Sequence, residues 1–319
     1  MKVLVADKFE SVGVRGLKEC GCQVVVNPEL KDDALVDGLQ REQPQVLIVR
    51  STKVGEQAVA AAGSLKLIVR AGAGVDTIDV PAATRHGIRV ANCPGKNSVA
   101  VAELVFALLL SLDRRVVENV NDLRAGKWNK KEYSKARGIK GLTLGIVGVG
   151  QVGREVVKRA LAFDMRVLYT DIVPAPELDK TPGVRRVTLE ELLKGGDVVS
   201  VHVPLTEQTR HLINAERLRL MRPGAILINT SRGGVVDEKA VAAALAEGKL
   251  GGVGLDVYEI EPSAAGTVFE DPIVKHPRVY GTHHIGASTD QAQTAVAEET
   301  VRIVREYLSG GKVLNCVNP

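Results

Sequence analysis

The sequence predicts an α/β protein with two domains, each built on a parallel β-sheet. Short aliphatic runs alternate with amphipathic segments from Val3 to Asn92, a pattern typical of parallel sheets that helices cover on both faces. A second series of such runs starts at Leu142 with a glycine-rich turn and extends to Tyr280. The length of 319 residues also suits two domains better than one.

Composition argues against several classes of protein. The formal net charge is +4 without a long block of one sign, so we expect no nucleic acid partner. The longest apolar stretch, residues 99–112, contains Glu103 and is shorter than the roughly 20 residues of a membrane span, so we expect no membrane partner. The four cysteines lack zinc-type spacing, and the chain starts directly with a strand-like segment. These features predict a reducing, cytoplasmic location.

The glycine-rich turn carries the strongest functional signal. Residues 142–171 read as a strand, a turn with Gly148, Gly150 and Gly153, a helix, a second strand and Asp171, the context that a dinucleotide-binding fingerprint requires. The first glycine permits the tight turn, the second lets the backbone approach a pyrophosphate, and the third lets the helix pack closely on the strand.

Asp171 bears on the choice of cofactor. It follows Gly153 by 171 − 153 = 18 residues, near the spacing of about 20 at which a carboxylate meets the adenosine ribose. A carboxylate there repels a 2′-phosphate, and no arginine directly follows it in the sequence. We therefore predict NAD rather than NADP as the cofactor.

The remaining runs complete two sheets. Six strands around the glycine turn match a full doubly wound, Rossmann-type domain. A helical pattern at 288–308 and a short tail cannot form a domain, so we expect them to pack on the first sheet. The prediction is a smaller, discontinuous, flavodoxin-like α/β domain for the substrate (1–96 and 287–319) and an NAD-binding domain (97–286). The predicted strands are 3–7, 22–26, 46–50, 66–70 and 88–92 in the first sheet, and 142–147, 166–170, 197–204, 225–229, 251–257 and 278–280 in the second.

The helix expected from Ser98 to Leu112 is apolar nearly all round. Such a helix must be covered on more than one side. We interpret the region 98–112 as the connection between the domains and as the interface of a homodimer.

Three strand ends of the second sheet carry residues that could bind a carboxylate or take part in acid–base catalysis. Ligands of open parallel sheets bind beyond these strand ends. Arg232 can offer a planar fork of donors to a carboxylate. Glu259 and Glu261 follow the next strand, and His283 and His284 follow the last one. An imidazole titrates near neutral pH and suits acid–base catalysis beside a carboxylate. The paired histidines, His283 and His284, could suggest a metal site, but no other ligand cluster accompanies them, so we expect no metal.

Two arginines occupy equivalent strand ends in the first sheet. Arg50 ends VLIVR and Arg70 ends KLIVR, with Gly72 and Gly74 adjacent to the second. One such arginine is usually just solvated, whereas two at equivalent ends suggest a second anion besides the carboxylate that Arg232 would hold. A phosphate at the far end of a three-carbon acid fits this pattern.

Taken together, the chain resembles the D-isomer-specific 2-hydroxyacid dehydrogenases over nearly its whole length. The resemblance implies hydride transfer between NAD and a 2-hydroxy or 2-oxo acid. It also implies that Arg232 binds the substrate carboxylate, that His284 is the acid–base residue and that Glu261 is the partner of this histidine. The motifs that carry the resemblance are GVGQVG at 148–153, NTSRGGVVDE at 229–238, GLDVYEIEP at 254–262 and HIGAST at 284–289.

The resemblance implies further binding residues. Asp256 matches the residue that holds the nicotinamide carboxamide. The substrate-binding residues that it implies are Arg50, Arg70, Gly72, Ala73 and Asn97. The cofactor-binding residues that it adds to Gly148, Gly150, Gly153 and Asp171 are Gln151, Val152, Val203, Pro204, Thr209, Thr230, Ser231 and Gly286.

Within the family the chain is most similar to the 3-phosphoglycerate dehydrogenases, in a short form without a C-terminal regulatory domain. This implies oxidation of D-3-phosphoglycerate to 3-phosphohydroxypyruvate for serine biosynthesis. A glyoxylate or hydroxypyruvate reductase, or another D-2-hydroxyacid dehydrogenase, stays open as an alternative. An NAD(H)-sensing binding protein similar to transcriptional co-repressors is an alternative of a different class. The motifs are RAGAGVD at 70–76, AATRHGI at 82–88, KNSVAVAEL at 96–104 and GKW at 126–128.

Overall fold

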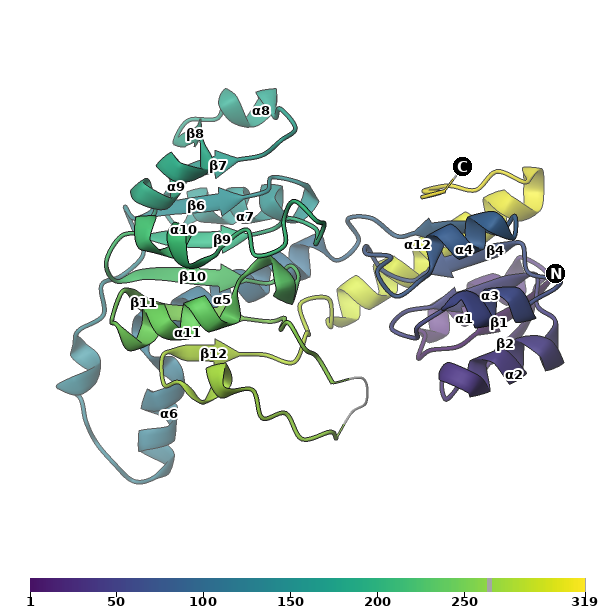
Figure 1. Cartoon of the computed structure of the whole chain (residues 1–319), viewed down its shortest axis with the longest axis horizontal. Helices are drawn as coiled ribbons and strands as arrows, with labels where there is room; N and C mark the ends of the chain where they lie inside the picture. Colours follow the sequence, from purple (N-terminus) through teal and green to yellow (C-terminus); the bar gives the residue numbers. More distant parts are fainter. Residues whose placement is uncertain (263–265, 319) are drawn as a thin grey trace. The chain divides into compact units, whose positions relative to one another are not determined.

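The computed structural model describes residues 1–262 and 266–318 of the chain. The chain forms two compact units, one of residues 1–97 and 287–319 and one of residues 98–286 (Figure 1). This division falls one residue from the expected boundary, so Asn97 belongs to the first unit. Each unit has its own parallel sheet and its own apolar core, and the predicted α/β fold is confirmed.

The first unit contains a five-stranded parallel sheet with the order β2-β1-β3-β4-β5. This is the flavodoxin-like order, in which the chain reverses direction across the sheet beside β1. The five predicted strands are present, and their ends lie within two residues of the expected positions. They are β1 (Lys2–Val5), β2 (Gln23–Val26), β3 (Val46–Val49), β4 (Leu67–Arg70) and β5 (Arg89–Asn92).

Helices cover both faces of this sheet. Successive side chains of a strand point to opposite faces, so Leu4 joins the core under α2, α3 and α4, whereas Val3 and Val5 join the core under α1 and α12. The long C-terminal helix α12 is therefore part of the first unit, as its yellow ribbon in Figure 1 shows. The helices are α1 (Ser11–Glu19), α2 (Asp32–Glu42), α3 (Glu56–Ala61), α4 (Val80–Arg85) and α12 (Asp290–Gly310).

The C-terminal tail bonds to strand β5. Cys316 forms an antiparallel bridge with Ala91, and the Val317 amide donates to the Val90 carbonyl at 2.8 Å. The Asn318 side chain accepts from the Val90 amide at 2.7 Å. The expectation that the C-terminus packs on the first domain is thus confirmed.

The second unit contains a seven-stranded parallel sheet with the order β12-β11-β10-β9-β6-β7-β8. Its first six strands in the chain follow the order of a doubly wound dinucleotide-binding domain, and β12 extends that sheet by one strand. The strands are β6 (Thr143–Val147), β7 (Arg166–Thr170), β8 (Val184–Arg186), β9 (Val198–Val201), β10 (Ala225–Asn229), β11 (Leu250–Leu255) and β12 (Val279–Gly281).

Strand β8 was not among the six strands expected here. It has three residues, two of them exposed, and pairs only with β7 at the edge of the sheet. So short an edge strand shows neither a buried aliphatic run nor a clear alternation, and one of these two signals is needed to recognise a strand from sequence. The omission matters because β8 carries Arg186, which lies beside the predicted cofactor site.

Helices also cover both faces of the second sheet. Helices α5, α7 and α8 pack on one face, and α9, α10 and α11 pack on the other. They are α5 (Ser98–Arg114), α7 (Gln151–Ala162), α8 (Pro176–Asp179), α9 (Leu189–Gly195), α10 (Ala215–Leu220) and α11 (Glu238–Ala246), with short 3₁₀ turns η2 (Gly233–Val235) and η3 (Pro272–Lys275).

Helix α5 is covered within its own unit, contrary to our reason for placing an interface there. Leu108 packs at Gly254 and Leu112 packs at Gly252, so the helix lies directly on β11. Among the large apolar side chains of residues 98–112, Val99 alone is exposed. The all-round apolar character therefore reflects burial against the sheet and α7.

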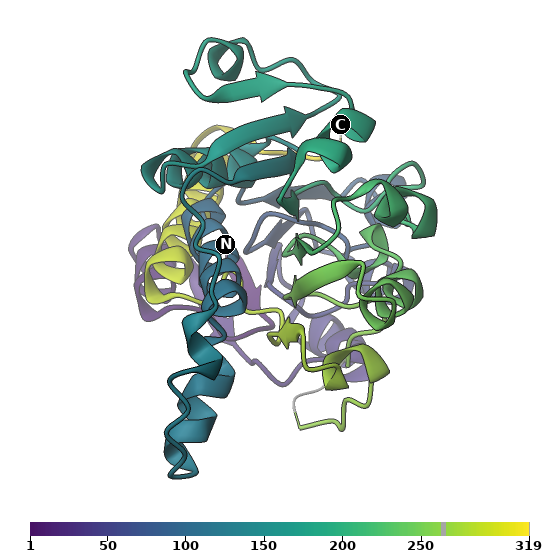
Figure 2. The ribbon, with the colours of Figure 1, turned by 90° about the vertical axis from the view of Figure 1, so that its left-hand side faces the viewer.

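The exposed apolar surface lies instead on the segment that follows. Helix α6 (Val116–Arg124) buries none of its residues, and it extends away from the second sheet in both views (Figures 1 and 2). A 3₁₀ turn, η1 (Glu132–Ser134), follows it. Across the described residues, no helix is both long and apolar enough to cross a membrane. The exposed apolar side chains of this arm, residues 116–128, are Val116, Val117, Val120, Leu123 and Trp128.

Candidate active site

The glycine turn has the geometry of a dinucleotide-binding turn. Gly148 follows β6 with a φ of +93°, and a Cβ there would lie 2.7 Å from the His202 carbonyl oxygen. A Cβ on Gly153 would overlap the Gly148 carbonyl, which explains the close packing of α7 on the turn. Gly150 caps α7, and apart from this glycine and its chain neighbours no described residue comes within 4 Å of its Cβ position. Open space at the start of a 12-residue helix fits a pyrophosphate, because the first N–H groups of the helix are unpaired there.

Asp171 lies beside this turn, at the end of β7. Its Oδ2 accepts a hydrogen bond from the Val149 amide at 2.7 Å, and its Oδ1 accepts one from the Val173 amide at 2.8 Å. Arg186 on the neighbouring strand donates from Nη2 to the Asp171 carbonyl at 2.9 Å. The sequence showed no arginine next to Asp171, but strand pairing brings one to it.

A third loop at the carboxyl ends of these strands contains Val203, Pro204 and Thr209. It follows β9, which ends at Val201 although we expected that strand to continue to Pro204. The Thr209 hydroxyl donates to the Pro204 carbonyl at 2.6 Å and accepts from the Thr206 amide at 2.7 Å. These bonds close the loop on itself and keep it at the same strand ends as the glycine turn.

The arginine loop, residues 230–237, follows β10 and is shaped by the buried Asn229. Its Oδ1 accepts from the amide and the hydroxyl of Ser231 at 3.0 and 2.7 Å, and its Nδ2 donates to the Arg232 carbonyl at 2.8 Å. Asn229 thus organises the loop, a role that we had not predicted although the residue opens the NTSRGGVVDE motif. The Thr230 hydroxyl is buried and has no hydrogen-bond partner among the described residues, which leaves it available to a ligand.

His284 and Glu261 form a pair at the ends of β12 and β11. The Nδ1 atom of the histidine lies 2.7 Å from Oε2 of the glutamate, and Oε1 of the glutamate accepts from the Tyr258 amide at 3.1 Å. Burial raises the pKa of Glu261, but the hydrogen bond and charge of His284, with smaller contributions from the Tyr258 amide and Arg232, lower it below its usual range overall. Glu261 is therefore an ionised partner for the imidazole.

Asp256 holds the loop that carries His284. It is 1% exposed, and its carboxylate accepts from the Thr282 hydroxyl at 2.7 Å and from the amides of Ile285 and Gly286 at 2.8 Å each. His284 has a φ of +52°, a conformation that non-glycine residues adopt at a cost. The three bonds around it offset that cost. His283 is exposed, and this arrangement gives it no role.

Arg50 and Arg70 lie at neighbouring strand ends of the first unit. Val49 pairs with Arg70 in the β3–β4 register, and Arg50 follows Val49 directly. The buried carboxylate of Asp7 accepts from the Arg50 amide at 2.6 Å and from the Thr52 amide at 3.0 Å, which fixes the loop after β3. The two arginines thus share one edge of the sheet, as expected for equivalent strand ends.

The loop after β4 has little free space. A Cβ on Gly72 would overlap the guanidinium of Arg70, so this glycine lets the arginine fold over the backbone. The Asn92 side chain donates to the Ala73 carbonyl at 2.5 Å. Asn97 is the last residue of the first unit before α5 begins.

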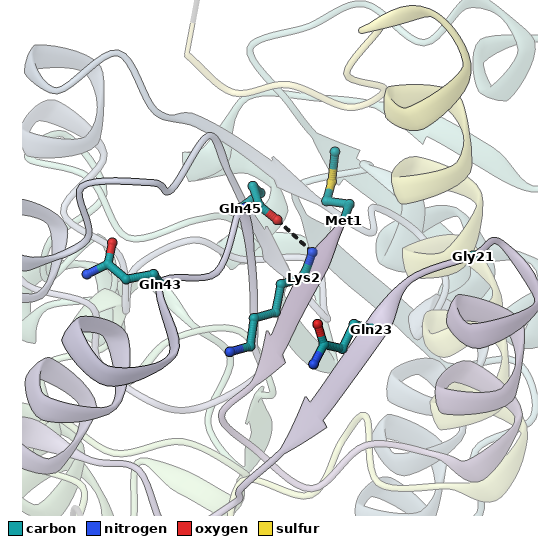
Figure 3. Close-up of a pocket in the computed structure, with 6 residues that line it drawn as sticks. All are labelled: Met1, Lys2, Gly21, Gln23, Gln43 and Gln45. Atoms are coloured by element: carbon teal, nitrogen blue, oxygen red, sulfur yellow. Dashed lines mark hydrogen bonds between the residues drawn. The ribbon is translucent and has the colours of Figure 1, made fainter.

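A surface hollow away from all of these residues lies at the amino ends of β1 and β2, the sheet edge opposite Arg50 and Arg70. Gln45 there accepts from the Lys2 amide at 2.6 Å (Figure 3). Ligands of parallel sheets bind at the carboxyl ends, so we place no function here. Its lining residues are Met1, Lys2, Gly21, Gln23, Gln43 and Gln45.

Comparisons with known proteins agree with this geometry. Residues 106–286 match the family model of the D-isomer specific 2-hydroxyacid dehydrogenase, NAD binding domain. The chain is 40% identical to the D-3-phosphoglycerate dehydrogenase of Methanocaldococcus jannaschii over 100% of this chain and 59% of that protein. It is 43% identical to the hydroxypyruvate reductase of Thermotoga maritima over 89% of this chain and 90% of that one.

A solved structure shares the fold of the whole chain. The TT0316 protein from Thermus thermophilus superimposes with a TM-score of 0.88 and is 38% identical over 99% of this chain and 100% of that one. The family match covers more than half of this sequence, and the open glycine turn fits the nucleotide that the family name specifies. The chain belongs to the D-isomer-specific 2-hydroxyacid dehydrogenases and carries the NAD-binding domain of that family.

Proposed function

We propose that this chain oxidises D-3-phosphoglycerate to 3-phosphohydroxypyruvate with NAD, a step of serine biosynthesis. The observation that carries the proposal is the His284–Glu261 pair, 2.7 Å apart at the strand ends of an NAD-binding domain, with Arg232 close enough to lower the pKa of Glu261. An ionised carboxylate, an imidazole and an arginine are the groups that oxidation of a 2-hydroxy acid requires.

Each residue has a separate task. Arg232 binds the substrate carboxylate through its guanidinium. The Nδ1 atom of His284 faces Glu261, so the other ring nitrogen, Nε2, exchanges a proton with the oxygen on C2. In oxidation the neutral imidazole accepts the hydroxyl proton, and in reduction the imidazolium returns it. The glycine turn and Asp171 would hold NAD, which would supply the acceptor for the hydride from C2.

Further cofactor contacts belong to the same proposal. Asp256 faces the Gly286 amide and would hold the nicotinamide carboxamide. The Thr230 hydroxyl would donate to the cofactor, since it has no described partner in the protein. The remaining proposed contacts are Gln151, Val152, Val203, Pro204, Thr209 and Ser231.

The substrate's phosphate is assigned to Arg50 and Arg70 of the first unit. Gly72, Ala73 and Asn97 would contribute backbone and amide groups to the substrate. Both arginines lie at the edge where parallel sheets bind ligands, and the Asp7 bonds hold the first of them in a defined loop. Two guanidinium groups suit a dianion better than an uncharged hydroxymethyl group.

A hydroxypyruvate or glyoxylate reductase is the second candidate. It is favoured by the 43% identity to the hydroxypyruvate reductase of Thermotoga maritima, because this chain covers 90% of that protein. The chain covers only 59% of the D-3-phosphoglycerate dehydrogenase of Methanocaldococcus jannaschii. The candidates differ in the substrate's third carbon, which carries a phosphate in phosphohydroxypyruvate, carries a hydroxyl in hydroxypyruvate and is absent from glyoxylate.

A panel of substrates tests the proposal. NAD-coupled turnover is measured with 3-phosphoglycerate, glycerate and lactate, and NADH oxidation is measured with hydroxypyruvate, glyoxylate and phosphohydroxypyruvate. We expect the highest kcat/KM for the phosphorylated pair. A clear preference for hydroxypyruvate or glyoxylate would favour the second candidate, and absence of turnover with every acid would contradict both.

The quaternary and cellular parts of the proposal are a homodimer and a cytoplasmic location. The exposed apolar side chains of the 116–128 arm support a dimer built on this arm, adjacent to the 98–112 region that the sequence suggested. All four cysteines are free, which supports a reducing compartment.

A further inference from the structure

A buried carboxylate outside the proposed triad lies next to the arginine loop. Glu238 opens α11 at the end of the NTSRGGVVDE motif and is only 9% exposed. Its Oε1 accepts from the Glu259 amide at 2.7 Å, and its own amide donates to Oε1 of Glu259 at 3.2 Å. Two residues separated by 21 positions thus exchange backbone-to-carboxylate bonds.

Burial of the Glu238 carboxyl group beside Glu259 lowers the stability of the fold. Burial raises the pKa of Glu238 to about 7, and the charges of Asp271, Glu259 and Glu261 add to the effect, although the bond from the Glu259 amide opposes it. On the other side, Oε1 of Glu259 lies 3.1 Å from Nε2 of His211. A buried acid surrounded by other acids lowers stability, so the benefit of this contact lies in what it connects.

The contact connects the arginine loop with the glutamate loop, which we define as residues 258–261. Glu259 stands two residues before Glu261. Tyr258 donates from its amide to Glu261 and from its hydroxyl to the Thr282 carbonyl at 3.1 Å, two residues before His284. The glutamate loop is therefore bonded directly to the loop that carries His284.

The other side of the glutamate loop packs against the residue that follows Arg232. A Cβ on Gly233 would overlap the Tyr258 carbonyl group, so the two loops touch without an intervening side chain. Packing of this kind keeps the loops in contact but does not fix their register. The directional bond from the Glu259 amide to Glu238 supplies the register.

We propose that Glu238 is a positioning residue, which holds the backbone of the glutamate loop against the arginine loop and so keeps Glu261 aligned with His284. It touches neither substrate nor cofactor in this role. The inference rests on the proposed assignment of Glu261 and His284, and it does not depend on which 2-oxo acid is reduced.

Two nearly isosteric variants separate the hydrogen bond that Glu238 accepts from the charge that it carries. Glu238→Met keeps the length of the side chain and removes the acceptor, whereas Glu238→Gln keeps an acceptor oxygen and removes the charge. We expect Glu238→Met to lower kcat for reduction about 10-fold, as loss of one buried hydrogen bond does, and to move the alkaline limb of its pH profile to lower pH. The KM for NADH should stay unchanged. Glu238→Gln should keep the wild-type profile.

Asp197→Ala is the matched control. Asp197 also accepts a backbone bond, from the Thr143 amide at 2.9 Å, in the same unit. This variant should lower the melting temperature while leaving the pH profile in place, which separates positioning from general stability.

The pH profiles of the Glu238 variants are compared with that of Glu261→Gln. A wild-type kcat and profile in Glu238→Met, together with a shifted profile in Glu261→Gln, would overturn the role of Glu238. A shift of equal size in Glu238→Met and Glu238→Gln would also overturn it, because the charge rather than the bond would then be responsible. An unchanged profile in Glu261→Gln itself would instead contradict the proposed function of the pair.

Discussion

The Nδ1 atom of His284 lies 2.7 Å from Oε2 of Glu261, across the ends of two neighbouring strands. The pKa of Glu261 lies below its usual range because the histidine's hydrogen bond and charge outweigh burial. With a lowered pKa the carboxylate keeps its charge below the usual titration range of a glutamate. On the acid side, its attraction for the protonated imidazole is lost as the pH falls through that lowered pKa.

Glu261→Gln should remove the negative charge beside the imidazolium. The acid needed for reduction is then lost at lower pH, so the alkaline limb of the reduction profile should move to lower pH. We also expect kcat to fall about 10-fold to 10⁴-fold, the range of a general acid–base contribution. Steady-state rates across pH measure both effects. Glu190→Gln, which alters an exposed carboxylate paired with Lys194 in the same unit, serves as the control. Equal behaviour of the two variants would remove Glu261 from the mechanism.

Asp171 should make NAD the better cofactor by kcat/KM, since a 2′-phosphate would meet its carboxylate. Asp171→Asn should raise the ratio of NADP to NAD activity. The nearby Arg186 can then pair with the 2′-phosphate. Adding Arg186→Ala to Asp171→Asn should therefore lower the ratio of NADP to NAD activity about 10-fold to 100-fold, the effect of losing a charge-assisted contact. Arg185→Ala is the control, because alternate residues of β8 point to opposite faces. A wild-type preference for NADP would refute the assignment of Asp171.

Arg70→Ala should weaken 3-phosphoglycerate selectively. Losing one charge-assisted contact costs roughly 1.5–3 kcal/mol, or about 10-fold to 100-fold in binding. Hydroxypyruvate reduction should change little, because that substrate lacks the phosphate. The KM of each substrate is compared with that of Arg85→Ala, which breaks an exposed ion pair with Glu56 in the same unit. If both substrates suffer equally from the loss of Arg70, the residue supports the loop and the reductase alternative gains support.

The double variant Val120→Glu with Leu123→Glu should convert the proposed dimer to a monomer. Both side chains are exposed on α6, at 38% and 52%, and charges there would be buried unpaired in an interface. Sedimentation velocity at micromolar concentration measures the change. Val268→Glu alters an exposed apolar residue away from the arm and should leave the dimer intact. A wild-type monomer at this concentration would exclude the dimer altogether.

Glu299→Gln should destabilise the protein more at neutral pH than at acidic pH. Hydrogen bonds from Arg302, and then from Asn315 and Lys96, lower the pKa of this buried glutamate from 4.5 to about 2 against the effect of burial. Because the folded-state pKa is depressed, the stability is present above pH 4.5 and is lost as the pH falls toward 2. We expect a loss of about 2–3 kcal/mol at pH 7. Urea unfolding at pH 7 and pH 3 measures it, and an equal loss at both values would contradict the charge-based explanation.

Much of this molecule was predictable from sequence because the signals are local. Aliphatic runs mark buried strands, so eleven strands were expected near where they occur. The glycine spacing placed the turn, and Asp171 lies beside it as expected. Since parallel strands end at one edge, the positions of Arg232, Glu261 and His284 after successive strands suffice to assign them to the same side of one sheet.

Other features depend on which strands and loops become neighbours, and no local pattern encodes that. Arg186 reaches Asp171 because the short edge strand β8 pairs with β7. Glu238 meets Glu259 because two loops of different strands pack at Gly233. Helix α5 is apolar on most sides, and its sequence does not tell whether a sheet or a second chain covers it, whereas the structure packs it on β11 and α7. Sequence thus determined the strands, the turn and the reactive residue types, whereas tertiary packing decided which charges meet, because that depends on distances between segments far apart in the chain.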